Sequence, residues 1–217
     1  MESLNPGPQM NELVVNDPTG YWAKDGYITR GNERRLWNAQ EQAMFAWAIN
    51  FLVDDQMIHP TLVRGRALEV GCGPGQNLWM LQKVLDMDVT GLDVSPRAAK
   101  EWATHDWDME RTDFRSEDVF ASDWFWNLPE PAFDLVITRW FLTHVQRGPE
   151  KTKLIEKLKA VGRSLVCIEG WYQDPRKPDQ YFADDHWVCL DDWEDYGLTE
   201  YELFRPHFSK IFYHNRP

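Results

Sequence analysis

Apolar residues change their spacing repeatedly along this chain, and each change predicts a new element. Short apolar runs bounded by glycine or polar residues are typical of strands, whereas apolar residues repeated every three or four positions are typical of a buried helix face. The predicted strands are residues 66–70, 88–93, 113–119, 133–138, 163–169 and 209–215. The run at 113–119 is weak and that at 133–138 is stronger.

Helices are predicted between these strands. The predicted helices cover residues 35–58, the segment with Leu78, Leu81 and Leu85, the segment that starts at Ser95-Pro96, and the segment from Leu154 to Val161 that Gly162 ends. Serine is a common N-cap, proline fits the first helical position, and glycine commonly follows the last turn.

Repeated strand–helix–strand units of this length predict an α/β fold: a doubly wound, mainly parallel, Rossmann-like sheet with helices on both faces. Residues 1–34 lack periodicity and are expected to form an arm or cap, followed by one domain over residues 35–217. The last part of the chain is less regular, so we expect shortened C-terminal strands and a chain that ends before a full terminal hairpin.

Composition narrows the classes of partner. The chain has 217 residues, 43% of them hydrophobic, and a net charge of −12, which argues against unassisted binding of nucleic acid. It contains no apolar run of about 18 residues, so we expect no membrane span. The first residues do not resemble a signal peptide, and the 3 cysteines indicate reduced thiols of a cytoplasmic protein and no zinc site.

The most informative segment is the glycine-rich turn Gly71-Cys72-Gly73-Pro74-Gly75, which follows the first strand of the sheet. In such sheets, ligands bind beyond the carboxyl ends of the strands, where the strand order reverses. Glycine allows positive φ and close approach of a ligand, and the N-terminus of the next helix favours an anionic group. A tight turn without a ligand is the alternative.

Two cofactor classes use such a turn. A dinucleotide site requires G-x-G-x-x-G, but here the residue two after Gly75 is Asn77, and Glu69 precedes the first glycine. A nicotinamide-dependent oxidoreductase is therefore disfavoured. The segment is similar to motif I of the class I S-adenosylmethionine-dependent methyltransferases. In that family an acidic residue ends the first strand, and the glycine turn holds the methionine part of the cofactor.

Further segments resemble the same family, in order, over residues 66–170. Asp93 stands where the family places a carboxylate on the ribose hydroxyls. Glu117-Asp118-Val119 resembles its adenine-binding element, and the segments 133–136 and 141–145 resemble its fourth strand and the helix behind it. The cofactor-binding residues that this resemblance implies are Glu69, Gly71, Cys72, Gly73, Gly75, Asn77, Asp93, Val94, Asp118, Val119, Thr138 and Arg139.

The N-terminal arm contains an aromatic stretch with Trp22, Tyr27 and Arg30. Similar segments in small-molecule members of the family fold over the cofactor. An aromatic ring near a sulfonium gains a cation–π contribution, and Arg30 can pair with a carboxylate. The alternative, of equal weight, is that the aromatic rings only attach the arm to the domain.

The acceptor class follows from what the chain lacks. The residues Thr138-Arg139-Trp140-Phe141 depart from the [DNS]PP[YF] motif of enzymes that methylate DNA bases, and the net charge is acidic. We therefore expect an enzyme that transfers a methyl group to a small molecule by in-line displacement. The alternative is a catalytically silent relative that binds the cofactor and serves as a partner subunit.

Two segments are candidates for the acceptor side. His144 lies just beyond the fourth strand and is a candidate general base, with a structural role as the alternative. Residues 181–187 combine carboxylates, a histidine and aromatic rings, and can recognise a cationic or hydroxylated acceptor or form a solvated acidic loop. They make a poor metal site, because adjacent side chains converge only if the chain bends sharply.

Overall fold

The structure is a computed structural model that describes residues 45, 49, 64–104, 111–145, 148–170, 193–201 and 209–216. The N-terminal arm, with Trp22, Tyr27 and Arg30, and the segment 181–187 lie outside these residues. Of the helix predicted over 35–58, only Phe45 and Ile49 are described, and both are helical and buried.

A seven-stranded sheet forms the centre of the molecule, with the order β3-β2-β1-β4-β5-β7-β6. Its strands are β1 (Arg66–Val70), β2 (Asp88–Asp93), β3 (Thr112–Ser116), β4 (Phe133–Arg139), β5 (Gly162–Gly170), β6 (Thr199–Tyr201) and β7 (Ser209–Asn215). The first five strands pair in parallel, whereas β7 is antiparallel to both β5 and β6. The predicted mainly parallel α/β sheet is confirmed.

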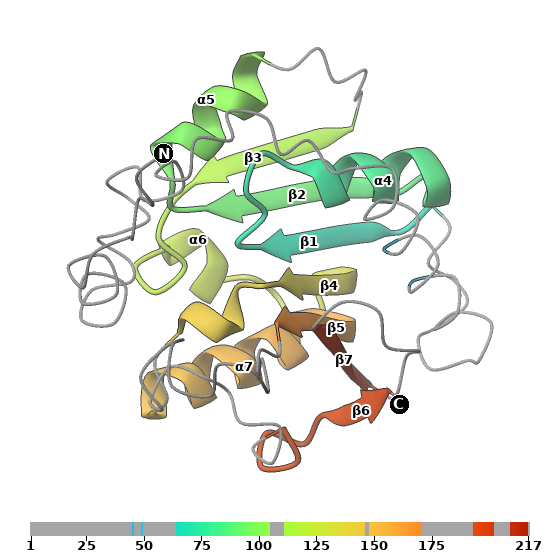
Figure 1. Ribbon diagram of the computed structural model, residues 1–217, viewed down its shortest axis with the longest axis vertical. Helices are drawn as coiled ribbons and strands as arrows, with labels where there is room; N and C mark the ends of the chain where they lie inside the picture. The colour runs from blue at the N-terminus through green and yellow to red at the C-terminus, as the bar shows by residue number, and fades with distance from the viewer. Residues whose placement is uncertain are drawn as a thin grey trace, which may run out of the picture.

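Helices connect the parallel strands (Figure 1). They are α4 (Gln76–Leu85), α5 (Pro96–Thr104), α6 (Asp123–Trp126), the 3₁₀ helix η3 (Leu142–His144) and α7 (Pro149–Val161). The Ser95 hydroxyl accepts a hydrogen bond from the Ala98 N–H at 3.3 Å, as predicted for an N-cap. Within the described part of the chain, none of the helices is long and apolar enough to cross a membrane.

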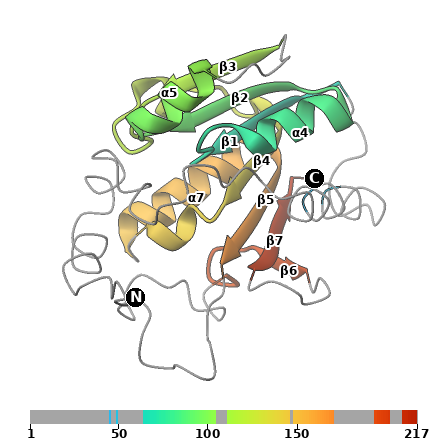
Figure 2. The same ribbon diagram turned by 45° about the horizontal axis from the view of Figure 1, so that its top comes forward.

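Two hydrophobic clusters lie on opposite faces of the sheet, because successive strand side chains alternate between the faces. Ala67 of β1 packs with Leu78 and Leu81 of α4 in one cluster. The next residue, Leu68, packs with α7 residues such as Leu158 in the other. Figure 2 shows α4 and α7 on different sides of the sheet. This two-sided burial explains the near-continuous apolar runs of the central strands.

The strand order reverses between β1 and β4, which lie side by side in the middle of the sheet. From β1 the chain proceeds outward through β2 to β3, and then returns to β4 on the other side of β1. In Figure 1 the arrowheads of β1, β2 and β4 point to the same edge. The segments after these strands therefore meet at the position where ligands bind in such sheets.

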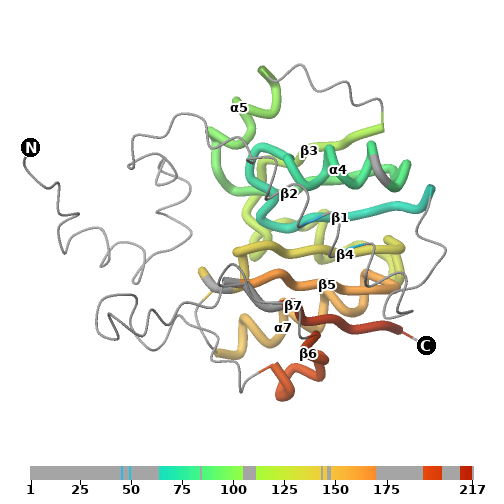
Figure 3. Tube along the Cα trace, turned by 45° about the vertical axis from the view of Figure 1, so that its right-hand side comes forward, coloured from blue at the N-terminus to red at the C-terminus, as the bar shows by residue number. Residues whose placement is uncertain are grey.

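The C-terminal part of the sheet differs from expectation. β7 spans Ser209–Asn215 as predicted, and β6 pairs with it to complete the antiparallel edge, so the expected loss of the terminal hairpin is wrong (Figure 3). Only β6 is short, with 3 residues. Its polar sequence, Thr-Glu-Tyr, has no apolar run, and its pairing partner β7 supplies the order that the sequence pattern does not indicate.

Candidate functional site

The glycine turn after β1 has a backbone that only glycine adopts readily. Gly71, Gly73 and Gly75 have φ values of 73°, 52° and 86°. The Gly71 N–H donates to the Leu92 carbonyl at 2.8 Å, which binds the turn to the end of β2. A Cβ at Gly75 would lie 2.0 Å from the Trp102 ring, so the turn also packs directly against α5. The glycine-rich turn that the sequence predicts after the first strand is therefore present.

Asp93, the last residue of β2, joins the two predicted halves of the site. Its Oδ2 accepts the Gly73 N–H at 2.8 Å, and its Oδ1 accepts the Ser95 N–H at 2.8 Å. A carboxylate has further acceptor positions, so these two bonds fix its orientation and leave capacity for a ligand. Burial raises the pKa of Asp93 above its ordinary value, and the two N–H groups oppose that shift. Val94, the next residue, is half-buried.

Glu69 lies beneath the glycine turn and is almost entirely buried, with 1% of its surface exposed. Its Oε1 accepts a hydrogen bond from Asn77 Nδ2, and Asn77 Oδ1 accepts one from Arg139 Nη1 at 3.3 Å. Glu69 Oε2 is buried and has no hydrogen-bond partner in the part of the chain described here. Side chains from β1, α4 and β4 thus form one hydrogen-bonded series at the switch point of the sheet, the position between β1 and β4 where the strand order reverses.

Burial controls the protonation of this region. The pKa of Glu69 is raised to about 8, mainly because the protein interior solvates its charge poorly, while Asn77 and Arg139 oppose that effect. Burial also raises the pKa of the Cys72 thiol, so this cysteine stays protonated. The Cys72 sulfur packs toward the core, where a Cβ at Gly91 would lie 2.7 Å from it. The Cys72 thiol also donates to the Gly73 carbonyl within the turn at 3.4 Å.

The segment after β3 differs from the predicted strand over 113–119. The strand ends at Ser116, because Asp118 Oδ1 accepts the Phe120 N–H at 3.0 Å and turns the chain. Glu117 accepts a hydrogen bond from the Ser122 hydroxyl, and its N–H donates to the Asp93 carbonyl at 3.1 Å. Asp118 is half-buried and Val119 is 3% exposed, so the adenine-binding residues that the resemblance implied follow the strand rather than belong to it.

Residues at the end of β4 face different partners. Arg139 reaches toward α4, as described, whereas the Thr138 hydroxyl donates to Glu169 Oε1 of β5 at 2.8 Å. His144 is half-buried in η3, and its backbone N–H donates to the Phe141 carbonyl at 2.9 Å. The structure thus brings Glu69, Asn77 and Arg139 together, and it places Thr138, which donates to Glu169, and His144 at the same edge.

Three residues of this edge are missing from the sequence prediction. Glu169 is 2% exposed and bonds Thr138, and Lys151 is 1% exposed and donates to the Leu142 and Val145 carbonyls at 2.6 and 3.0 Å. Trp102 packs on Gly75. The only sequence signal for Glu169 is a charged residue at the end of an apolar strand, and Lys151 resembles any other lysine of a helix.

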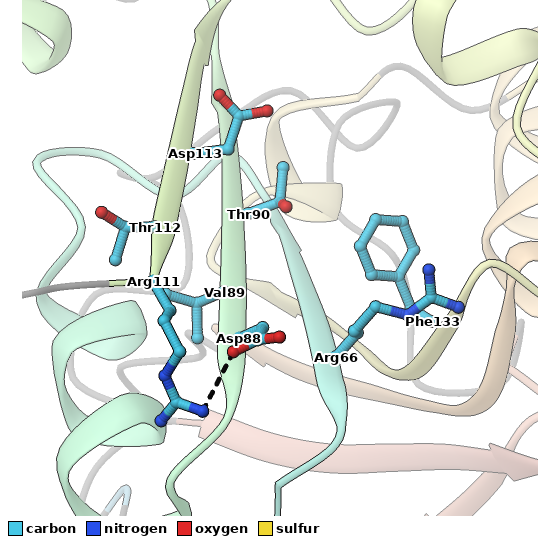
Figure 4. Close-up of a pocket in the computed structure, with 8 residues that line it drawn as sticks. All are labelled: Arg66, Asp88, Val89, Thr90, Arg111, Thr112, Asp113 and Phe133. Carbon is cyan, nitrogen blue, oxygen red and sulfur yellow. Dashed lines mark ion pairs between the residues drawn. The ribbon is translucent and has the colours of Figure 1, made fainter.

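A shallow pocket of about 280 Å³ lies at the opposite edge of the sheet, where the strands begin (Figure 4). Its lining includes Arg66, Asp88, Arg111 and Phe133. Arg111 forms an ion pair with Asp88 at 3.1 Å, and the Arg66 guanidinium lies 6.0 Å from the centre of the Phe133 ring. Ligands of doubly wound sheets bind at the carboxyl ends of the strands, whereas this pocket lies at their amino ends. It therefore lies apart from the candidate cofactor site.

Comparison with known proteins agrees with this geometry. Residues 67–164 match a family model described as a methyltransferase domain. No curated protein matches the sequence.

Solved structures are similar over most of the chain. One is the N-methyltransferase NodS from Bradyrhizobium japonicum WM9 in complex with S-adenosyl-L-homocysteine, at 16% identity and a TM-score of 0.65, covering 93% of this chain and 100% of that one. Another is magnesium protoporphyrin IX methyltransferase from Synechocystis PCC 6803 with bound S-adenosylmethionine, at 18% identity and a TM-score of 0.57, covering 98% and 100%.

A third similar structure is a methyltransferase from Aquifex aeolicus, described as dependent on S-adenosylmethionine, at 17% identity and a TM-score of 0.53, covering 77% of this chain and 96% of that one. At these identities the likeness establishes the fold. Residues 67–164 thus match the methyltransferase family model, and the chain shares the fold of these methyltransferase structures.

Proposed function

We propose that this protein binds S-adenosylmethionine at the carboxyl ends of β1, β2 and β4 and transfers its methyl group to a small-molecule acceptor. The observation that carries the proposal is the buried Glu69 Oε2, which lacks a hydrogen-bond partner among the described residues at the switch point of the sheet. A buried polar atom without a partner is costly, and a ligand that donates a hydrogen bond there removes the cost.

The described residues fit this cofactor in three respects. The ammonium group of its methionine part would satisfy Glu69 Oε2. The Asp93 carboxylate, held by two backbone N–H groups, has the acceptor capacity for ribose hydroxyls. Gly73 has a positive φ and no side chain, which permits close approach of a ligand to the turn.

When bound, the cofactor supplies an electrophilic methyl group on a sulfonium. The contribution of this chain is position: the glycine turn and Asp93 orient the ligand, while the buried Glu69–Asn77–Arg139 chain holds its inner end. An in-line displacement gains much of its rate from such alignment of the reacting atoms. An acceptor that must lose a proton needs a base, and His144 of η3 is our candidate for that role.

Calorimetric titration with S-adenosylhomocysteine tests the cofactor site directly, because this product lacks only the transferred methyl group. We expect binding in the micromolar range and no comparable binding of NAD. An absence of heat at millimolar S-adenosylhomocysteine contradicts the proposal, and tight NAD binding would instead support an oxidoreductase.

The ribose assignment has its own test. Asp93→Ala removes the acceptor for the ribose hydroxyls and also releases the Gly73 N–H, so we expect the affinity for S-adenosylhomocysteine to fall at least tenfold, or about 1.4 kcal/mol. Asp113→Asn, an exposed carboxylate change on β3, is the matched control and should leave the affinity unchanged. An unaltered affinity of the Asp93 variant counts against the assignment.

A catalytically silent relative is the competing candidate. The short C-terminus motivates it, because the acceptor wall of such enzymes is often built there. β6 and β7 complete the sheet, so this candidate loses the observation that favoured it. An assay of methyl transfer from labelled cofactor to a panel of small amines, phenols and carboxylates distinguishes the two candidates. Transfer to any of them supports an active enzyme, and no transfer supports a silent relative.

A further inference from the structure

Trp140 is the large apolar side chain that stands out on the surface of the described residues. Its exposed fraction is 50%, whereas the other large hydrophobic residues in the described part of the chain are buried or half-buried. It directly follows β4, whose carboxyl end lies beside that of β1 at the switch point. A single exposed ring is common on protein surfaces, so the position of this one at the ligand-binding edge and its backbone conformation are what distinguish it.

The backbone at Trp140 is strained. Its φ is 53°, in the left-handed region that bulky residues rarely adopt. Asp86 has a similar φ, but it caps the end of α4, where this conformation is common. Trp140 follows the last residue of β4, and its N–H donates to the Ile168 carbonyl at 3.0 Å, which fixes the strained residue to β5. Strain of this kind concentrates at functional sites.

The left-handed turn separates Trp140 from its neighbour. The Phe141 ring lies against the glycine turn, since a Cβ at Gly71 would come within 2.6 Å of its Cδ2. Phe141 is half-buried against the core, whereas Trp140 is exposed. The chain thus places one ring against the glycine turn and leaves half of the surface of the other exposed at the same edge.

We propose that Trp140 is the platform on which the methyl acceptor stacks, and that the acceptor therefore carries a flat, conjugated ring. This inference rests on the proposed function, because it needs the cofactor at the neighbouring turn. An indole face is rigid and favours planar partners over saturated ones of equal size. The strained backbone holds the indole in place before the acceptor arrives, which lowers the entropy cost of binding.

Substitution of Trp140 by glycine tests the role of the indole ring without disturbing the fold. Trp140→Gly deletes the indole and relieves the backbone strain, because glycine adopts a φ of 53° readily. We expect this variant to fold and to bind S-adenosylhomocysteine within about twofold of the unaltered protein. Trp126→Phe is the matched control: it removes a tryptophan of α6 whose ring lies 4.6 Å from the Lys153 amine.

The experiment uses two probes that differ only in planarity, naphthoate and decahydronaphthoate, each titrated by NMR against protein saturated with S-adenosylhomocysteine. Both carry a carboxylate, which keeps them soluble in water. We expect naphthoate to bind at least about fivefold more tightly than its saturated counterpart, and Trp140→Gly to abolish that preference while Trp126→Phe keeps it.

Equal binding of the two probes, no binding of either, or a preference that survives in Trp140→Gly overturns the inference. These outcomes differ from failure of the proposed function, because the titration with S-adenosylhomocysteine comes first. A protein that binds S-adenosylhomocysteine but does not distinguish the probes is a methyltransferase without a stacking platform. A protein that does not bind S-adenosylhomocysteine refutes the proposed function and, with it, the inference.

Discussion

Glu69 shows how the interior changes the chemistry of a single residue. An ordinary glutamate is ionised at neutral pH, but burial raises the pKa of this carboxyl to about 8. The protonated form is therefore preferred in the folded protein. Its contribution to the free energy of unfolding is fully present below the ordinary pKa, and it is lost as the pH rises from there through about 8.

Cofactor binding should release a proton from Glu69. A cationic ammonium beside the carboxyl favours its ionised form, so near pH 7 we expect binding of S-adenosylhomocysteine to release a substantial fraction of a proton. The affinity should rise with pH toward about 8 and then level off. Calorimetry in buffers with different ionisation enthalpies measures the number of protons released.

Glu69→Gln provides the comparison for that measurement. Glutamine keeps a side-chain oxygen next to Asn77 but has no carboxyl proton to lose, so the release should largely disappear. Glu101→Gln, a change in the ion pair with Arg97 on α5, is the control and should leave the release as it was. Equal proton release from the unaltered protein and from Glu69→Gln would mean that another group titrates.

At the scale of elements, the short helix η3 depends on a buried lysine. The Lys151 amine, in the first turn of α7, donates to the carbonyls of Leu142 and Val145, which flank His144. A buried ammonium group needs such acceptors, and the carbonyls at the end of a short helix need donors. The contact therefore orders both elements and sets the position of the candidate base.

Lys151→Met should loosen η3 while leaving α7 in place. Methionine fills the space of the aliphatic stem but cannot donate to the two carbonyls. We expect hydrogen exchange at the N–H groups of His144 and Val145 to accelerate by about tenfold or more. Lys153→Met, an exposed change on the same helix, should leave these rates unchanged. Equal protection in both variants would show that η3 is held by other contacts.

The elements also show where sequence patterns succeed. β1, β2 and β7 have the predicted bounds, because each is a distinct run between polar or glycine residues. The third strand was predicted over 113–119 but ends at Ser116, since Asp118 can either continue a strand or accept a hydrogen bond that ends it. Neighbours in space, not the local pattern, decide between those outcomes.

At the scale of the whole molecule, the antiparallel edge is attached to the parallel core by aromatic packing. The Phe212 ring of β7 stacks on Trp193 with a centroid distance of 4.1 Å, and both side chains are buried in the cluster beneath α7. Burial of two aromatic rings contributes several kcal/mol, enough to hold a three-residue strand that is unstable alone.

Phe212→Ala should therefore lower the free energy of unfolding by about 3–5 kcal/mol. Urea denaturation measures this as a lower midpoint with an unchanged slope, if the whole chain unfolds as one unit. Tyr213→Phe, a change that removes only a hydroxyl on the opposite face of β7, should stay within about 0.5 kcal/mol. A small loss in Phe212→Ala would indicate that the terminal strands fold independently of the core.

The sequence by itself determined the fold class, the central strands and the glycine turn with Glu69 and Asp93. These features depend on local properties: apolar periodicity, the conformational range of glycine, and the order of motifs along the chain. The same properties led to the resemblance to methyltransferases, because the motifs of that family are short and follow strands that local pattern can identify.

Only the tertiary structure decided which of these side chains meet. The link from Glu69 through Asn77 to Arg139 joins three elements, and a backbone hydrogen bond attaches Trp140 to β5. The terminal pair β6–β7 exists because buried rings hold it against the sheet. Contacts between residues distant in sequence, and the burial that raises the pKa of Glu69, arise only when the chain is folded.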